Sequence, residues 1–224
     1  MTFRDRLLRQ HEAIEDRAVA MASRRAVAKV LEGGCEALCV VVCADADGDS
    51  AFTAVRNYLA IKNVTLGAGE FTRNNVKERI AQLYESRGCL GLKAHFHYLF
   101  QEEGVETIDT WKEKFSRQSA SLGRVSMYLA GLAFRLNFKV YALNADRGVW
   151  QPLDVATVRR SGAGTTVRLA YMSAGGVYED TLNHYEPLII TPGPEDLVQI
   201  NRLNAAYQAR TNRAMGSGAA GLDY

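Results

Sequence analysis

Apolar positions in the first part of the chain follow helical spacing. Over residues 2–31, apolar side chains recur at this spacing among charged and alanine residues, and Gly33-Gly34 closes the segment. This pattern predicts one long helix or two shorter ones. Residues 37–43 form a short, valine-rich apolar run, which fits either a buried strand or the end of a helix.

Amphipathic helices are predicted through the middle of the chain. An acidic, glycine-containing turn at residues 45–49 precedes apolar positions at helical spacing from Ser50 onward, so we expect a helix that begins at this turn. The same criterion predicts further helices over residues 72–86, around Trp111, and over residues 125–134.

Alternating patterns characterise the second half of the chain. Strands are predicted over residues 138–143, 149–153, 166–171 and 185–191, and an amphipathic terminal helix over residues 195–215. Because helices come first and strands of antiparallel type follow, the order predicts an α+β fold rather than a doubly wound α/β fold.

Composition narrows the class of protein. The 224 residues suit one folded unit, and 27 basic against 25 acidic residues give no strong field for nucleic acid or a membrane surface. No apolar run reaches the roughly 18 residues that span a bilayer, and the first residues lack the apolar segment of a signal peptide. The four cysteines, Cys35, Cys39, Cys43 and Cys89, include no CxxC pair, and the first three recur at every fourth position, so we expect these three to be small buried residues in a reducing, cytosolic protein.

Two segments carry residues suited to chemistry. In Asp47-Gly48-Asp49-Ser50, a tight turn places a nucleophile-type side chain in the first turn of a helix, where the positive end of the helix favours a thiolate and an oxyanion. Taken alone, this serine also fits an ordinary helix cap. His95 and His97 alternate but lack a third ligand, so a structural role is favoured over a metal site.

The second segment is His184-Tyr185-Glu186, at the start of a predicted strand. Residues two apart on a strand point the same way, so the Glu186 carboxylate can orient the His184 imidazole. A serine or cysteine with a histidine and an acid makes the nucleophile, base and orienting group of a triad. His184 alone also fits an ordinary strand residue.

Both segments resemble the ovarian-tumour (OTU) domain family of papain-like cysteine proteases. That family has an Asp-Gly-x-Cys-Leu/Ala-Phe-x-Ala-Val/Ile motif, which residues 47–55 match except for a serine at the cysteine position, and a closing His-Tyr-Asp/Asn/Glu motif, which residues 184–186 match. The resemblance covers about residues 35–191, but only these two motifs are specific.

The resemblance implies a fold and a site. It implies a small, mostly antiparallel central sheet flanked by helices, with a core over residues 35–192, an N-terminal helical extension over 1–34, and a C-terminal helix and tail over 193–224. Ser50 takes the place of the nucleophile, His184 that of the general base and Glu186 that of the orienting acid. Supporting roles fall to an oxyanion loop at Asp47, Gly48 and Asp49, and to Asn183 as further polar support.

The implied function is a cytosolic deubiquitinase. It would hydrolyse the isopeptide bond at the C-terminus of ubiquitin or a ubiquitin-like modifier, alone or in polyubiquitin chains, without a cofactor or metal. The poor match outside the two motifs suits a divergent viral or bacterial effector, which would act in the host cytosol, and a viral polyprotein-processing protease is the related alternative.

Ser50 departs from the family pattern. A hydroxyl must lose its proton during attack, whereas a cysteine supplies a thiolate. We favour an introduced replacement that silences the enzyme, because His184 and Glu186 are intact. The alternatives are a natural serine in a non-catalytic ubiquitin-binding protein, and a serine esterase unrelated to ubiquitin.

Overall fold

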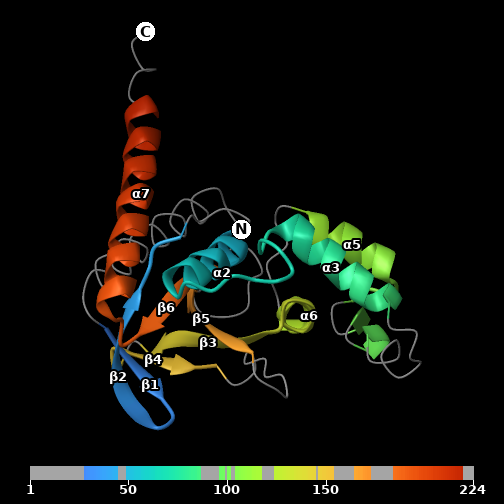
Figure 1. Ribbon diagram of the computed structural model, residues 1–224, viewed down its shortest axis with the longest axis horizontal. Helices are drawn as coiled ribbons and strands as arrows, with labels where there is room; N and C mark the ends of the chain where they lie inside the picture. Colours follow the sequence, from blue (N-terminus) through green and yellow to red (C-terminus); the bar gives the residue numbers. More distant parts are fainter. Residues whose placement is uncertain are drawn as a thin grey trace, which may run out of the picture.

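A computed structural model of the chain describes residues 28–44, 49–86, 96–98, 100–101, 104–117, 124–144, 146–153, 164–172 and 184–218 (Figure 1). The strands are β1 Ala28–Glu32, β2 Cys35–Val41, β3 Leu136–Asn144, β4 Val149–Pro152, β5 Thr165–Met172 and β6 His184–Ile190. The helices are α2 Ser50–Ile61, α3 Arg73–Ser86, α5 Ile108–Ser116, α6 Arg124–Phe134 and α7 Pro194–Gly218. Helices and strands are therefore mixed along the chain, and the sequence predictions for these helices and for β3 to β6 are confirmed within a few residues.

The helix predicted to extend to residue 31 is wrong over its last residues, which belong to β1. Gly33 and Gly34 have φ values of 59° and 86° and connect β1 to β2, with Glu32 paired to Cys35 across the turn. Two residues with positive φ make the tight turn that suits the twist of a hairpin. The glycine pair is therefore a hairpin turn rather than a helix stop, and residues 1–27 lie outside the described part of the chain.

The strands close into a barrel in the order β1-β2-β6-β5-β3-β4, instead of the simple central sheet that was expected. The β1–β4 and β3–β5 pairs are parallel and the other pairs are antiparallel, so the mostly antiparallel character is as predicted. Closure depends on β1, because Lys29 and Val30 pair with Val149 and Trp150 of β4. Without β1 as a strand, β2 and β4 are not joined and the sheet stays open, which is why a barrel was not predicted.

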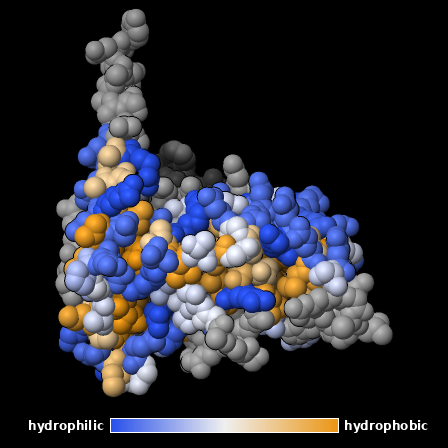
Figure 2. Space-filling model, in the orientation of Figure 1, coloured by the Kyte–Doolittle hydropathy of each residue, from blue (hydrophilic) through white to orange (hydrophobic). Residues whose placement is uncertain are grey.

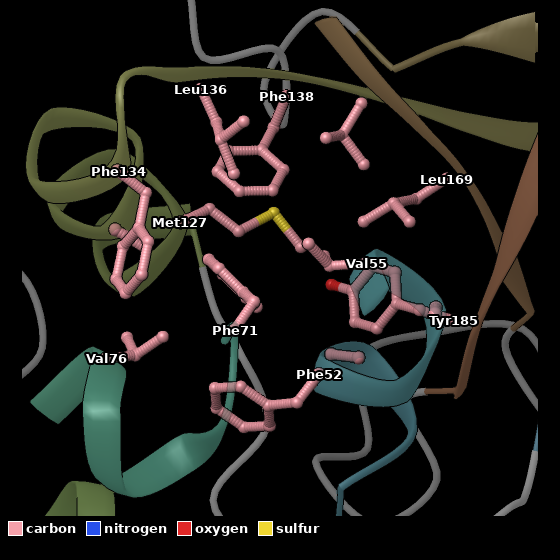
Figure 3. Close-up of a cluster of buried hydrophobic side chains, with 14 of the residues drawn as sticks. Phe52, Val55, Phe71, Val76, Met127, Phe134, Leu136, Phe138, Leu169 and Tyr185 are labelled. Atoms are coloured by element: carbon pink, nitrogen blue, oxygen red, sulfur yellow. The ribbon is translucent and has the colours of Figure 1, made fainter. Parts of the chain in front are cut away.

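Two apolar cores lie on opposite faces of the strands. The smaller one takes residues from every strand and therefore fills the inside of the barrel: Val30, Cys39, Val41, Tyr141, Trp150, Ala170 and Leu188. The larger one lies between the outer face of the strands and the helices, where Phe52, Val55, Leu169 and Tyr185 are among its members (Figure 3). This second core holds α2 against β5 and β6.

The cysteines behave differently from one another. Cys39 is buried in the barrel, and burial raises the pKa of its thiol to about 12, so it stays protonated and unreactive. Cys35, which was expected to be buried, is exposed at the hairpin end of β2, and Cys43 is partly buried. The prediction of small buried residues therefore holds fully only for Cys39 among the three.

Helix α7 packs by its first turns and then runs away from the barrel (Figure 1). Ile200 is buried in the larger core, and the Asn204 side chain accepts a hydrogen bond from the Cys43 amide at 3.3 Å. Leu197 and Val198 are exposed, and Figure 2 shows apolar surface around the base of this helix. Among the described residues, no helix combines the length and apolar character that crossing a membrane requires.

A polar cluster joins α2 to the barrel through Glu32 at the end of β1. Its carboxylate pairs with Lys139 at 2.7 Å and accepts a hydrogen bond from the Tyr141 hydroxyl. Arg168 lies 3.5 Å from the same carboxylate and donates to the Tyr58 hydroxyl of α2 at 3.2 Å. Burial alone would raise the pKa of Glu32, but the hydrogen bonds from Lys139 and Tyr141 and the positive charges of Lys139 and Arg168 lower it.

Replacing Glu32 with glutamine is expected to lower the free energy of unfolding at pH 7 by about 1.5 kcal/mol, the scale of a hydrogen bond to a charged group. Because the pKa of Glu32 is lower in the folded state than in the unfolded chain, this contribution is present at neutral pH. It disappears as the pH falls from the unfolded pKa of 4.5 through the lower folded value. Urea unfolding between pH 7 and pH 3 measures both effects.

The matched control is Glu36→Gln. Glu36 pairs with Lys29 at 2.9 Å in the same hairpin, but both side chains are at least half exposed, so little stability should be lost. Equal losses in the two variants, or an unchanged acid dependence in Glu32→Gln, would contradict the role assigned to the cluster.

Candidate active site

Ser50 is the first residue of α2 and is buried, with 4% of its surface exposed. Asp49 is the N-cap residue, and its carbonyl accepts the Thr53 amide at 3.0 Å. Its side chain makes no capping hydrogen bond to the helix, although an aspartate at this position usually does so. Residues 45–48, which include Asp47 and Gly48 of the expected oxyanion loop, lie outside the described residues.

The Asp49 carboxylate is instead held by Arg73, a residue that the sequence interpretation did not include. Arg73 Nε lies 2.6 Å from Asp49 Oδ1, and Arg73 Nη1 donates to the carbonyls of Phe115 at 2.8 Å and Arg117 at 3.2 Å. The guanidinium carbon also lies 4.8 Å from the centroid of the Phe52 ring. The available signal was its position in the first turn of α3, where a cation opposes the helix dipole and so needs a partner elsewhere.

His184 and Glu186 lie side by side on β6. His184 Nε2 is 3.1 Å from Glu186 Oε1, and the Glu186 side chain is completely buried whereas that of His184 is 12% exposed. With a proton on Nε2, the imidazole donates to the carboxylate and its lone pair lies on Nδ1. His184 Nδ1 is buried and has no hydrogen-bond partner among the described residues.

Tyr185 faces the other way from this pair. Its ring packs with Val55 and Leu169 in the larger core (Figure 3). Burial, together with the nearby Tyr171, raises the pKa of the Tyr185 phenol, so it stays neutral within this core. Because side chains alternate along a strand, His184 and Glu186 point to the barrel side. Glu186 accordingly pairs across the sheet with Ala170 of the barrel core, and His184 is the first residue of β6.

Chain direction places Ser50 and His184 at the same end of the fold. Strand β2 is antiparallel to β6, and the pairing continues past its end, since the Val42 amide donates to the Pro187 carbonyl at 2.9 Å. The chain therefore leaves β2 toward the start of β6. The next described element is α2, whose far end is tied by Lys62 to Asp196, in the first turn of α7 after β6, at 2.7 Å. Helix α2 and β6 therefore run in the same direction, side by side, and both begin at this end (Figure 1).

The structure brings two of the expected site residues together, and Ser50 begins the helix that packs beside their strand. His184 and Glu186 are in direct contact, whereas no hydrogen bond joins Ser50 to His184 among the described residues. Asn183, expected to support the site, lies outside the described residues.

In the described part of the chain, no group of three or more His, Cys, Asp or Glu side chains is placed to hold a metal ion. His97 is exposed, with its Nε2 atom 3.1 Å from the Gln101 side-chain nitrogen. His95 lies outside the described residues.

Comparisons with known proteins give little beyond this geometry. No protein-family profile and no curated protein sequence matches the chain. Among solved structures, the OTU domain of OTUD1 aligns over 82% of this chain and 99% of that chain, with a TM-score of 0.45 and 10% identity. A likeness of this degree does not assign a family or an activity.

Proposed function

We propose that the start of α2 and the start of β6 form the active site of an OTU-type cysteine protease that requires a cysteine at position 50. The observation that carries this proposal is the His184–Glu186 pair. A fully buried carboxylate holds one nitrogen of the imidazole, and the other nitrogen is left without a partner among the described residues. This is the arrangement of a general base whose acid orients it.

The proposed reaction is acyl transfer in two stages. The thiol of a cysteine at position 50 attacks the carbonyl carbon of the scissile bond and passes its proton to His184. Backbone amides at the start of α2 and in the 47–49 loop stabilise the oxyanion. His184 then protonates the departing amine, and water, deprotonated by the same imidazole, releases the acyl group. Glu186 holds the ring and balances the charge of the imidazolium.

Ubiquitin is the proposed substrate, with cleavage at the isopeptide bond that joins its C-terminus to a lysine. This part follows from the resemblance of residues 47–55 and 184–186 to the OTU motifs. A serine at position 50 keeps the surroundings of the nucleophile but removes the thiolate, so the chain with Ser50 should bind ubiquitin and turn it over very slowly.

The proposal is tested with di-ubiquitins and two single variants. Ser50→Cys is expected to cleave at least about 10³-fold faster than the Ser50 chain, a scale set by the loss of a nucleophile in hydrolases. Binding of ubiquitin to the Ser50 chain is followed by calorimetry. The matched control is Ser126→Cys, because Ser126 is also buried and lies in the first turn of a helix, α6.

Each outcome decides between the candidate functions. Cleavage by Ser50→Cys alone supports the protease. Binding without cleavage identifies a non-catalytic ubiquitin-binding protein, and ester hydrolysis with labelling of Ser50 by a fluorophosphonate identifies a serine esterase. Cleavage by both cysteine variants, or by neither without binding, contradicts the proposal.

A further inference from the structure

We infer that Arg73 is a positioning residue for the nucleophile, acting through Asp49. This inference rests on the proposed function, since its consequence is exerted at position 50. Arg73 keeps the Asp49 carboxylate off the amides at the start of α2 and balances its charge, so that these amides remain directed at the reacting group.

The contacts show that Arg73 is fixed by its surroundings and that it in turn fixes the Asp49 carboxylate. The Arg73 side chain is 9% exposed, whereas that of Asp49 is 50% exposed. Arg73 is fastened to the end of α5 by two backbone carbonyls, those of Phe115 and Arg117. Its guanidinium also lies over the ring of Phe52, on α2 itself, and near that of Phe115. A planar group held in this way offers its Nε atom in one fixed direction.

The effect on Asp49 is visible in the helix cap. An aspartate that precedes a helix ordinarily turns its carboxylate onto the first amides, which would occupy them and place a negative charge beside the nucleophile. Here the carboxylate is 2.6 Å from Arg73 Nε and makes no capping hydrogen bond to the helix. The first amides of α2 are therefore not occupied by the Asp49 carboxylate and can face the oxyanion that forms in the proposed reaction.

The opposite end of α2 offers a matched control. Lys62, the C-cap residue, pairs with Asp196 at 2.7 Å, so this ion pair also ties α2 to a distant segment. Breaking it disturbs the anchoring of the helix without changing the charge beside position 50. A merely structural role for Arg73 would therefore be reproduced by Lys62→Gln.

The experiment measures the rate at which iodoacetamide alkylates the introduced thiol of the Ser50→Cys protein at pH 7, resolved by peptide mapping. Arg73→Gln is expected to slow alkylation about tenfold, because an unbalanced carboxylate raises the pKa of a neighbouring thiol by about one unit. Lys62→Gln should stay within about twofold of the parent, and adding Asp49→Asn to Arg73→Gln should restore the rate to within about threefold.

Equal slowing by Arg73→Gln and Lys62→Gln, or no recovery with Asp49→Asn, overturns the inference. A crystal structure of Arg73→Gln provides a second test that needs no reagent: the Asp49 carboxylate should turn onto the first amides of α2, and an unmoved carboxylate contradicts the inference. Neither measurement uses ubiquitin, so a failure of the proposed function, seen as absent cleavage by Ser50→Cys, is distinguished from a failure of the role of Arg73.

Discussion

In the Ser50→Cys protein, replacement of His184 with alanine is expected to reduce di-ubiquitin hydrolysis by about 10³- to 10⁵-fold, the range found when a triad member is removed. In the proposed mechanism the imidazole supplies both proton transfers, and no other histidine is described near the site. The His184 side chain is 12% exposed at the beginning of β6, so the substitution opens a cavity and removes a hydrogen-bond partner of the buried Glu186, and some stability should be lost.

The control for this prediction is His97→Ala. His97 is exposed and is not placed near β6 by any described contact, so hydrolysis should be unchanged. A His184→Ala protein that retains more than about a tenth of the activity would exclude His184 as the general base, since proton transfer alone contributes at least about 10²-fold.

Replacement of Glu186 with glutamine should reduce hydrolysis in the same background by about 10²- to 10⁴-fold. The side chain is fully buried and contacts His184 Nε2. An amide can present its NH₂ group to that nitrogen, which stabilises the wrong tautomer of the imidazole and removes the charge that supports the imidazolium. Steady-state kinetics should show the loss in kcat, with KM nearly unchanged, because Glu186 makes no contact with substrate in this mechanism.

Tyr185→Phe is the matched control on the same strand. Tyr185 lies between the two residues in sequence but faces the larger core, so removal of its hydroxyl should leave kcat within about twofold, as expected for a residue outside the reacting groups. A loss of kcat in Tyr185→Phe equal to that in Glu186→Gln would show that the strand as a whole, rather than the acid, matters.

Local patterns were sufficient to predict most of the helices and strands and the contact between His184 and Glu186. Helical spacing located α2 and α6, and the two-residue period of a strand placed the histidine and the carboxylate on one face. Helical spacing and strand alternation depend only on residues that are close in the sequence, so these features can be predicted from the sequence alone.

Features that depend on contacts between distant residues were missed. The segment that forms β1 has apolar spacing compatible with a helix, and only its pairing with β2 and β4 determines that it is a strand. Barrel closure was missed for the same reason. Arg73 contacts Asp49 and carbonyls at the end of α5, which are distant in the sequence; its position in the first turn of α3 indicates that it needs a partner but not which partner.

The most direct test of the central claim is the reaction of the chain with ubiquitin that carries an electrophile at its C-terminus, followed by peptide mapping of the adduct. We predict an adduct on residue 50 in Ser50→Cys, none in the Ser50 chain or in Ser126→Cys, and a rate that falls at least about 10²-fold when His184 is also replaced by alanine. An adduct on another residue, or equal labelling with and without His184, would contradict the assignment of the start of α2 and the start of β6 as one active site.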